Sequence, residues 1–163
     1  MFSLNTDEQA AETGRLEIRE MTDKEVDEVC RLEEETFSMP WKKKDFLEMI
    51  ENDHMCYLVV LKDERVIAGA GIREIVGDIE ITNVAVKKDF RNRGIGTMLI
   101  NAVIDKGHEM GGGDFTLEVR AGNEAAIALY EKAGFKTEGV RKDFYERPVE
   151  DGLIMWKRGN GSL

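Results

Sequence analysis

The stretch VAVKKDFRNRGIGTM, residues 84–98, joins three features in a row: an apolar strand end, a basic loop with two spaced glycines, and the start of a helix. Gly94 and Gly96 let the backbone turn tightly and come close to a ligand. A helix that begins there presents unpaired N–H groups and the positive end of its dipole. We therefore predict an anion site suited to a pyrophosphate, to which Arg91 and Arg93 would add positive charge.

Two common nucleotide-binding loops do not fit this spacing. A P-loop requires a lysine between its last glycine and the Ser or Thr, whereas Thr97 follows Gly96 directly. A dinucleotide-binding loop requires a third glycine at the position that Leu99 occupies. The remaining alternative, a purely structural turn between a strand and a helix, stays open on the loop sequence alone.

The residues on both sides of this stretch predict an α/β fold. The expected order is β-α-α-β-β-β-α-β-α-β-β, which gives a mixed central sheet of six to seven strands flanked by four helices. Apolar periodicity places the strands at 16–20, 55–62, 65–75, 79–86, 115–119, 135–140 and 152–157. It places the helices between 22 and 37, at 43–51, from 96 to about 110, and between 123 and 134.

Local signals mark the ends and the packing of these elements. Thr22 and Glu25 have the spacing of a capping box, and residues 111–113 are three glycines that can end a helix. The small residues 69–71 within a strand indicate close packing or a bulge. In the second helix, the residues that we expect to face the core are Phe46, Leu47 and Ile50.

Composition and length limit the possible functions. The chain has 163 residues and a formal net charge of −10, so we expect one domain at 15–158 between a loose tail at 1–14 and a short tail at 159–163. The acidic charge argues against unaided binding to nucleic acid. It is compatible with a basic peptide or protein partner, although it could equally serve solubility alone.

Neither cysteines nor targeting signals indicate another class of protein. Cys30 and Cys56 lie in apolar segments and form no metal-like cluster with the two histidines, so we expect both to be buried and no metal to be bound. No apolar run is long enough for a membrane span, and the N-terminus lacks the features of a signal peptide. These features predict a cytoplasmic protein without a membrane partner.

The loop Arg91–Gly96 resembles the R/Q-x-x-G-x-G/A signature of the GNAT acetyltransferases. The order of elements is also similar to that fold, over about residues 16–156. Within the family the chain is most similar to the RimI-like group, the ribosomal-protein-alanine N-acetyltransferases. The runs that carry this narrower resemblance are FSMPW at 37–41, NVAV at 83–86, LEVRAGN at 117–123 and AAIALYEKAGF at 125–135.

The resemblance implies acetyl-CoA as co-substrate and a catalytic pair. It implies that Glu118 is the general base that takes a proton from the amine, and that Tyr130 is the general acid that protonates the leaving thiolate. A carboxylate with a pKa of about 4.3 is a weak base for an amine with a pKa of about 8. Burial would bring the two pKa values closer, and a relaying water would also help the proton transfer. The spacing alone favours a solvated residue at a strand end for Glu118 and a tyrosine at the edge of the core for Tyr130.

The resemblance also assigns the remaining site residues. A backbone N–H near Val86 is expected to stabilise the oxyanion in a gap between two splayed strands, and Asn123 is expected both to cap a helix and to contact coenzyme A. The residues expected to bind acetyl-CoA are Val84, Ala85, Val86, Arg91, Asn92, Arg93, Gly94, Ile95, Gly96, Thr97, Asn123 and Tyr130.

The implied reaction is direct acetyl transfer, through a ternary complex, to the N-terminal amine of a protein. The acceptor residue would be alanine, on a ribosomal or other protein. Trp41 and Tyr145 are expected to contact this peptide, but Phe144 replaces the first of two adjacent tyrosines that RimI-like proteins carry. A GNAT enzyme for a small amine and a non-catalytic acetyl-CoA-binding module remain as alternatives, and the sequence predicts no oligomeric state.

Overall fold

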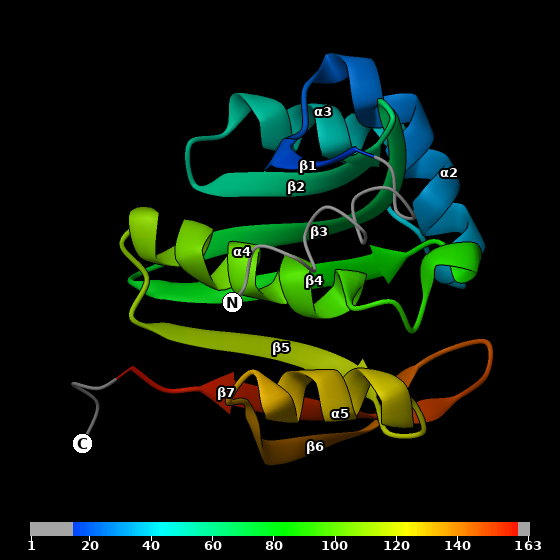
Figure 1. Ribbon diagram of the computed structural model, residues 1–163. Helices are drawn as coiled ribbons and strands as arrows, with labels where there is room; N and C mark the ends of the chain where they lie inside the picture. The colour runs from blue at the N-terminus through cyan, green and yellow to red at the C-terminus, as the bar shows by residue number, and fades with distance from the viewer. Residues whose placement is uncertain (1–14, 160–163) are drawn as a thin grey trace, which may run out of the picture.

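The computed structural model describes residues 15–159, so the predicted tail at 1–14 and all but the first residue of the tail at 159–163 lie outside the described residues. Seven strands in the described part form one mixed sheet in the order β1-β2-β3-β4-β5-β7-β6 (Figure 1). Strands β4 and β5 are parallel, and every other neighbouring pair is antiparallel. The predicted α/β fold is confirmed, with a mixed sheet and four α-helices in this part of the chain.

The observed elements lie close to the predicted ranges. The strands are β1 (Leu16–Glu20), β2 (Met55–Lys62), β3 (Arg65–Ile75), β4 (Asp78–Val86), β5 (Asp114–Arg120), β6 (Lys136–Tyr145) and β7 (Glu150–Lys157). The helices are α2 (Val26–Thr36), α3 (Lys43–Glu51), α4 (Ile95–Glu109) and α5 (Glu124–Lys132), with short 3-10 turns η1 (Asp23–Glu25) and η2 (Lys88–Phe90). None of the helices between residues 15 and 159 is both long and apolar enough to cross a lipid bilayer.

Strand β6 extends further than its sequence indicates. It continues to Tyr145, whereas we predicted a strand that ends at residue 140. Most of β6 is exposed, so its sequence lacks the apolar alternation that would predict a strand. Backbone pairing with β7, interrupted by two register shifts, holds it in the sheet instead.

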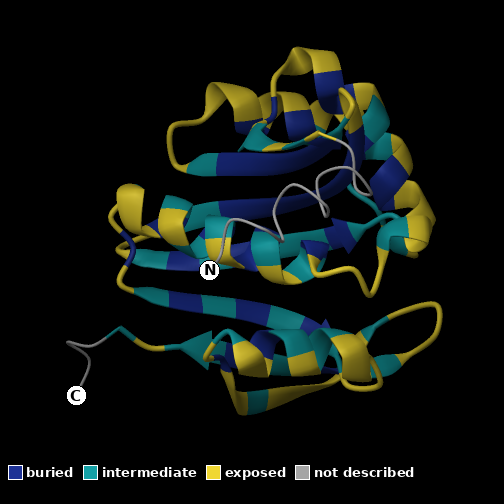
Figure 2. Cartoon of the chain, in the orientation of Figure 1, coloured by how far each residue is buried: buried dark blue, intermediate teal, exposed yellow. Residues whose placement is uncertain are grey.

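The sheet has a core on each face. Cys56, Leu58 and Val60 of β2 pack on the side that carries α4 and α5, whereas the alternate residues Tyr57 and Val59 pack on the side that carries α2 and α3. The central strands β2 and β3 are accordingly buried along most of their length (Figure 2). The predicted burial of Cys56 is confirmed, and desolvation raises the pKa of its thiol to about 12.

Helix α3 is rotated relative to our prediction. Phe46 is fully buried as expected, but Leu47 is 41% exposed and Ile50 is 38% exposed, so their predicted inward orientation is wrong. Met49, which is buried, takes the second inward position. Phe46 and Met49 are three residues apart and share one helical face, whereas Leu47 and Ile50 lie on the adjoining face.

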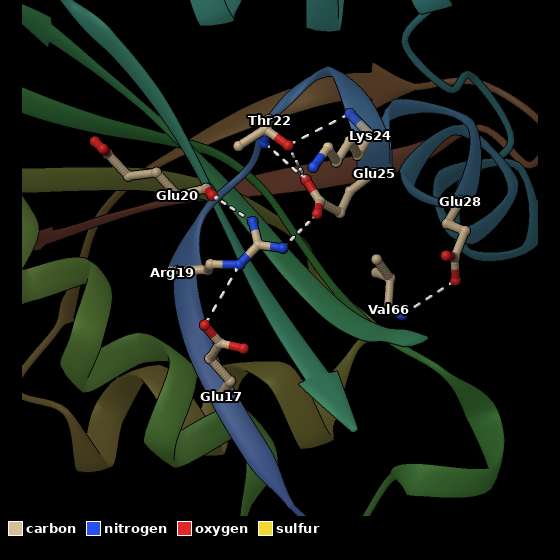
Figure 3. Close-up of polar contacts among 8 residues, drawn as sticks. All are labelled: Glu17, Arg19, Glu20, Thr22, Lys24, Glu25, Glu28 and Val66. Carbon is tan, nitrogen blue, oxygen red and sulfur yellow. Dashed lines mark hydrogen bonds and ion pairs between the residues drawn. The ribbon is translucent and has the colours of Figure 1, made fainter. Parts of the chain in front are cut away.

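A polar network attaches the first helix to the sheet (Figure 3). The predicted capping box is confirmed: the Thr22 hydroxyl accepts a hydrogen bond from the N–H of Lys24, and the Glu25 carboxylate accepts one from the N–H of Thr22 at 2.8 Å. Arg19 of β1 also donates to Glu25. Burial by itself raises the pKa of Glu25, but the hydrogen bonds from Arg19 and Thr22 outweigh it and hold that pKa at about 2.

Candidate active site

Strands β4 and β5 are paired at one end only. Their parallel pairing joins residues 78–81 to residues 114–117 and stops at Ile81 and Leu117. Beyond this point the strands are no longer paired, and a cleft of about 1550 Å³ opens where they diverge. Its walls come from α2, β4, β5 and α5, and from the loops before α3, before α4 and before β7. The predicted gap between two strands is therefore present.

The exposed edge of β4 offers backbone groups to this cleft. The N–H of Lys87 donates to the carbonyl of Ile67 on β3 at 2.8 Å. Because successive N–H groups of a strand point to opposite sides, the N–H of Ala85 also points to β3, and those of Val84 and Val86 point into the gap. Arg91 Nε donates to the Val86 carbonyl at 3.0 Å. An extended chain can pair with this edge as an additional strand would.

The glycine loop forms the cradle that its sequence predicts. Gly94 precedes α4 with a φ of +81°, a conformation that favours glycine. Its carbonyl accepts the N–H of Met98 at 3.1 Å, so the three preceding N–H groups, at residues 95–97, have no acceptor within the helix. A Cβ on Gly96 would lie 3.1 Å from Leu129, so this glycine allows α4 to approach α5 closely. These three N–H groups are therefore available to donate to an anionic ligand.

The structure separates the expected cofactor residues into two groups. Ala85 and Ile95 are buried in the two cores, and the Arg93 guanidinium lies over the Phe90 ring at 5.7 Å, so these three side chains do not line the cleft. The strand alternation turns Ala85 away, and the inner face of α4 takes Ile95 into the core. The expected residues that do line the cleft are Val84, Val86, Arg91, Asn92, Gly94, Gly96, Thr97, Asn123 and Tyr130.

Glu118 and Tyr130 line the same cleft. Glu118 is the first residue of β5 beyond the last pair with β4, and its side chain is 28% exposed. Burial raises its pKa, opposed by the Arg141 guanidinium, whose Nε lies 3.3 Å from its Oε1. Tyr130 is only 7% exposed, and burial also raises its pKa. Within residues 15–159 its hydroxyl has no hydrogen-bond partner, so it is free to act on a ligand.

Asn123 has its predicted structural role at the start of α5. Its side chain accepts a hydrogen bond from the N–H of Ala126 at 3.2 Å, as an N-cap does. Because Asn123 also lines the cleft, capping leaves a contact with a ligand possible.

Two loops meet over the mouth of the cleft. Trp41, which packs against Phe46, lies in the first loop, and Phe144 and Tyr145 precede the second. Arg120 at the end of β5 joins the two loops, because it donates to the Ser38 hydroxyl at 3.2 Å and to the carbonyls of residues 146 and 148 at 2.8 and 2.9 Å. Its guanidinium also lies 4.6 Å from the centre of the Tyr145 ring.

Sequence reasoning missed four residues of this site: Glu33, Asn83, Arg120 and Arg141. Glu33 lies in a run of three glutamates that is typical of a solvated helix face, yet it is 1% exposed. Its spacing of four residues from the apolar Val29 was the available signal. The two arginines gave no local signal, because their partners are distant in the sequence.

Comparison with known proteins agrees with this geometry. Residues 26–135 match the Acetyltransferase (GNAT) family. The [ribosomal protein bS18]-alanine N-acetyltransferase of Salmonella typhimurium is 35% identical over 127 residues, which cover 77% of this chain and 85% of the relative. The enzyme of that name from Escherichia coli K12 is 31% identical over 121 residues, covering 74% and 80%.

A solved structure gives the same result. The crystal structure of the ribosomal-protein-S18-alanine N-acetyltransferase from Escherichia coli matches with a TM-score of 0.81 and 26% identity, covering 91% of this chain and 99% of that one. The fold, the family match and the relatives agree, and the chain belongs to the GNAT family of acetyltransferases, which use acetyl-CoA as the acetyl donor.

Proposed function

We propose that this acetyltransferase modifies the N-terminal alanine of a ribosomal protein, the counterpart of S18. The observation that carries the proposal is that Glu118 and Tyr130 line one cleft, between the amide cradle of the glycine loop and a mouth bridged by two loops. The activity for which its relatives are named supports the choice of acceptor. Acetylation of ribosomal proteins would place the enzyme in the cytoplasm.

The cleft would hold acetyl-CoA through backbone groups. The N–H groups of residues 95–97 would donate to the diphosphate, assisted by the charge of Arg91. The edge of β4 at Val84 and Val86 would pair with the extended arm that leads to the thioester. The N–H of Val86 would then donate to the thioester oxygen as negative charge develops on it. When bound, acetyl-CoA supplies an acetyl group already activated as a thioester.

Glu118 and Tyr130 would manage the protons of the transfer. Glu118 would accept a proton from the acceptor amine, directly or through a water, and burial improves its match to an amine by raising its pKa. As the carbon–nitrogen bond forms and the carbon–sulfur bond breaks, the Tyr130 hydroxyl would donate its proton to the leaving sulfur. The nitrogen loses its second proton to solvent as the amide forms. Glu118 then releases its proton to solvent and Tyr130 recovers one, so both groups return to their starting state.

The peptide would enter between the two loops at the mouth. Trp41 would pack against the first side chains of the peptide. Tyr145 would contact the peptide through its phenol, and Phe144 has no hydroxyl to add a second such contact. The acidic chain, with a net charge of −10, suits the basic sequence of a ribosomal protein.

The test is acetyl transfer to defined peptides. We expect the protein to release free coenzyme A thiol with a peptide that begins with alanine, and mass spectrometry to place the acetyl group on its N-terminus. A peptide of the same sequence with a blocked N-terminus and an internal lysine serves as the control and should remain unmodified. Thiol release with spermidine but with no N-terminal amine would assign the enzyme to small amines instead.

A further inference from the structure

Glu33 is a buried carboxylate that the proposed mechanism does not use. It lies on α2 and is 1% exposed. Glu33 and Glu25 are the only buried charged residues within 15–159. One oxygen, Oε1, accepts a hydrogen bond from the Tyr57 hydroxyl at 2.8 Å and another from Asn83 Nδ2. Unlike Glu25, which Arg19 neutralises, Glu33 forms no ion pair with any described residue.

The second oxygen of Glu33, Oε2, has no hydrogen-bond partner among the described residues. Among the described residues, Arg73 Nε is the only side-chain nitrogen or oxygen that is both fully enclosed and without a hydrogen-bond partner. Glu33 Oε2 also has no hydrogen-bond partner, so it must be at least slightly exposed. Glu33 is one of the residues that line the cleft, so we infer that the small exposed part of Oε2 faces that space.

Glu33 and Glu118 stand on opposite sides of the point where the sheet opens. Asn83, which holds Glu33, lies on β4 two residues beyond the last pair with β5. Glu118 lies on β5 one residue beyond the same pair. The loop that carries Trp41 leaves α2 shortly after Glu33 and lines the same cleft. A ligand that enters past this loop meets a carboxylate on each side.

An unneutralised buried carboxylate destabilises a fold. Desolvation raises the pKa of Glu33 to about 7, against the hydrogen bonds from Tyr57 and Asn83, which lower it. An apolar residue of similar volume would avoid this cost. A cationic ligand in the cleft would offset it, and a primary ammonium is the cation that an amine acceptor brings.

We propose that Glu33 binds the protonated amine of the acceptor through Oε2 and holds it opposite Glu118, which then takes the proton. This inference rests on the proposed function, because it assigns a second contact to the same acceptor. Glu33 forms and breaks no covalent bond in this role. It orients the first residue of the peptide on the β4 side of the cleft.

The substitution Glu33→Gln separates binding from a purely structural role. The amide oxygen of glutamine can accept both existing hydrogen bonds, so only the oxygen that faces the cleft is replaced, by an NH₂ group. Glu34→Gln is the matched control, because Glu34 is its exposed neighbour on α2 and the change in net charge is the same. The full chain is used, with a peptide that begins with alanine and the same peptide without its α-amine.

Glu33→Gln should raise KM for the peptide at least tenfold and leave KM for acetyl-CoA unchanged. Inhibition by the peptide that lacks the amine should be the same in Glu33→Gln and the wild type, and Glu34→Gln should match the wild type throughout. A wild-type KM for the peptide in Glu33→Gln would overturn the inference while the proposed function stands. Equal weakening of both peptides would overturn it too, since that indicates a structural role.

A second measurement needs no variant. In the wild-type protein, NMR titration of the Glu33 carboxyl should show a lower pKa in the presence of the peptide, since a bound ammonium favours the carboxylate. The peptide without an amine should leave that pKa unchanged, and equal shifts with both peptides would overturn the inference. A wild-type enzyme that acetylates no N-terminal amine would overturn the proposed function and this inference together.

Discussion

Replacing Tyr130 with phenylalanine removes one hydroxyl and should separate activity from stability. The hydroxyl has no hydrogen-bond partner within residues 15–159, while the ring packs against Phe135 with its centre 6.0 Å away. The ring is kept and no protein hydrogen bond is lost, so we expect a stability change below about 0.5 kcal/mol. That corresponds to less than about 2 °C in Tm for a domain of this size.

The effect on catalysis should be far larger. A positioned general acid contributes on the order of 10²-fold to a rate, which is about 2.7 kcal/mol in the barrier. Tyr130→Phe should therefore lower kcat by about two orders of magnitude or more. The assay is steady-state thiol release from acetyl-CoA with a peptide that begins with alanine, alongside thermal unfolding followed by circular dichroism.

Tyr57→Phe is the matched comparison, since it removes the same group from a hydroxyl that does have a partner. Tyr57 donates to Glu33 at 2.8 Å in a buried position, so its loss should destabilise the protein by about 1–3 kcal/mol. A kcat for Tyr130→Phe within threefold of the wild type would refute the role of Tyr130 as general acid. A loss of stability in Tyr130→Phe as large as that in Tyr57→Phe would contradict a hydroxyl without a protein partner.

Three further predictions concern the carboxylates of the cleft. Glu118→Gln should lower kcat by about 10²-fold or more and leave coenzyme A affinity by calorimetry unchanged, because only the base is lost. The Arg141 guanidinium lowers the pKa of Glu118, which must be deprotonated to act as the base. Arg141→Met should therefore move the acid limb of the pH profile of kcat/KM to higher pH, whereas Arg141→Lys should leave it nearer the wild type. An unmoved acid limb in Arg141→Met would exclude this coupling. The pKa of Glu33 is raised from 4.5 to about 7 in the folded state, so the wild type should lose stability as pH rises through that window, by roughly 3 kcal/mol. Urea unfolding at pH 5 and pH 8 should find Glu33→Gln similar to the wild type at the lower pH and more stable at the higher one, and a pH-independent difference would contradict the burial argument.

The last of these predictions bears on why Glu33 is present. If the glutamine variant is more stable at pH 8 and yet a poorer enzyme, the carboxylate reduces the stability of the fold in exchange for its contact with the acceptor. The exposed Glu34 offers the comparison, since its replacement should change neither property.

Local patterns in the sequence were enough to place the elements and the cofactor loop. Apolar periodicity, the Thr22–Glu25 capping box and the glycines that flank α4 act between residues near in the chain, so they can be read without the fold. The pairing of Glu118 with Tyr130 came from resemblance to a family, and their shared cleft became visible only in the structure.

The tertiary structure alone decided the environment of individual side chains. Glu33 and its partner Asn83 are 50 residues apart, and Arg120 and Ser38 are 82 apart, so no local pattern could indicate either contact. The same holds for Leu47 and Ile50, whose exposure depends on how α3 rotates against the sheet. A sequence encodes the period of each element, whereas burial and charge at one position depend on which distant segments fold against it.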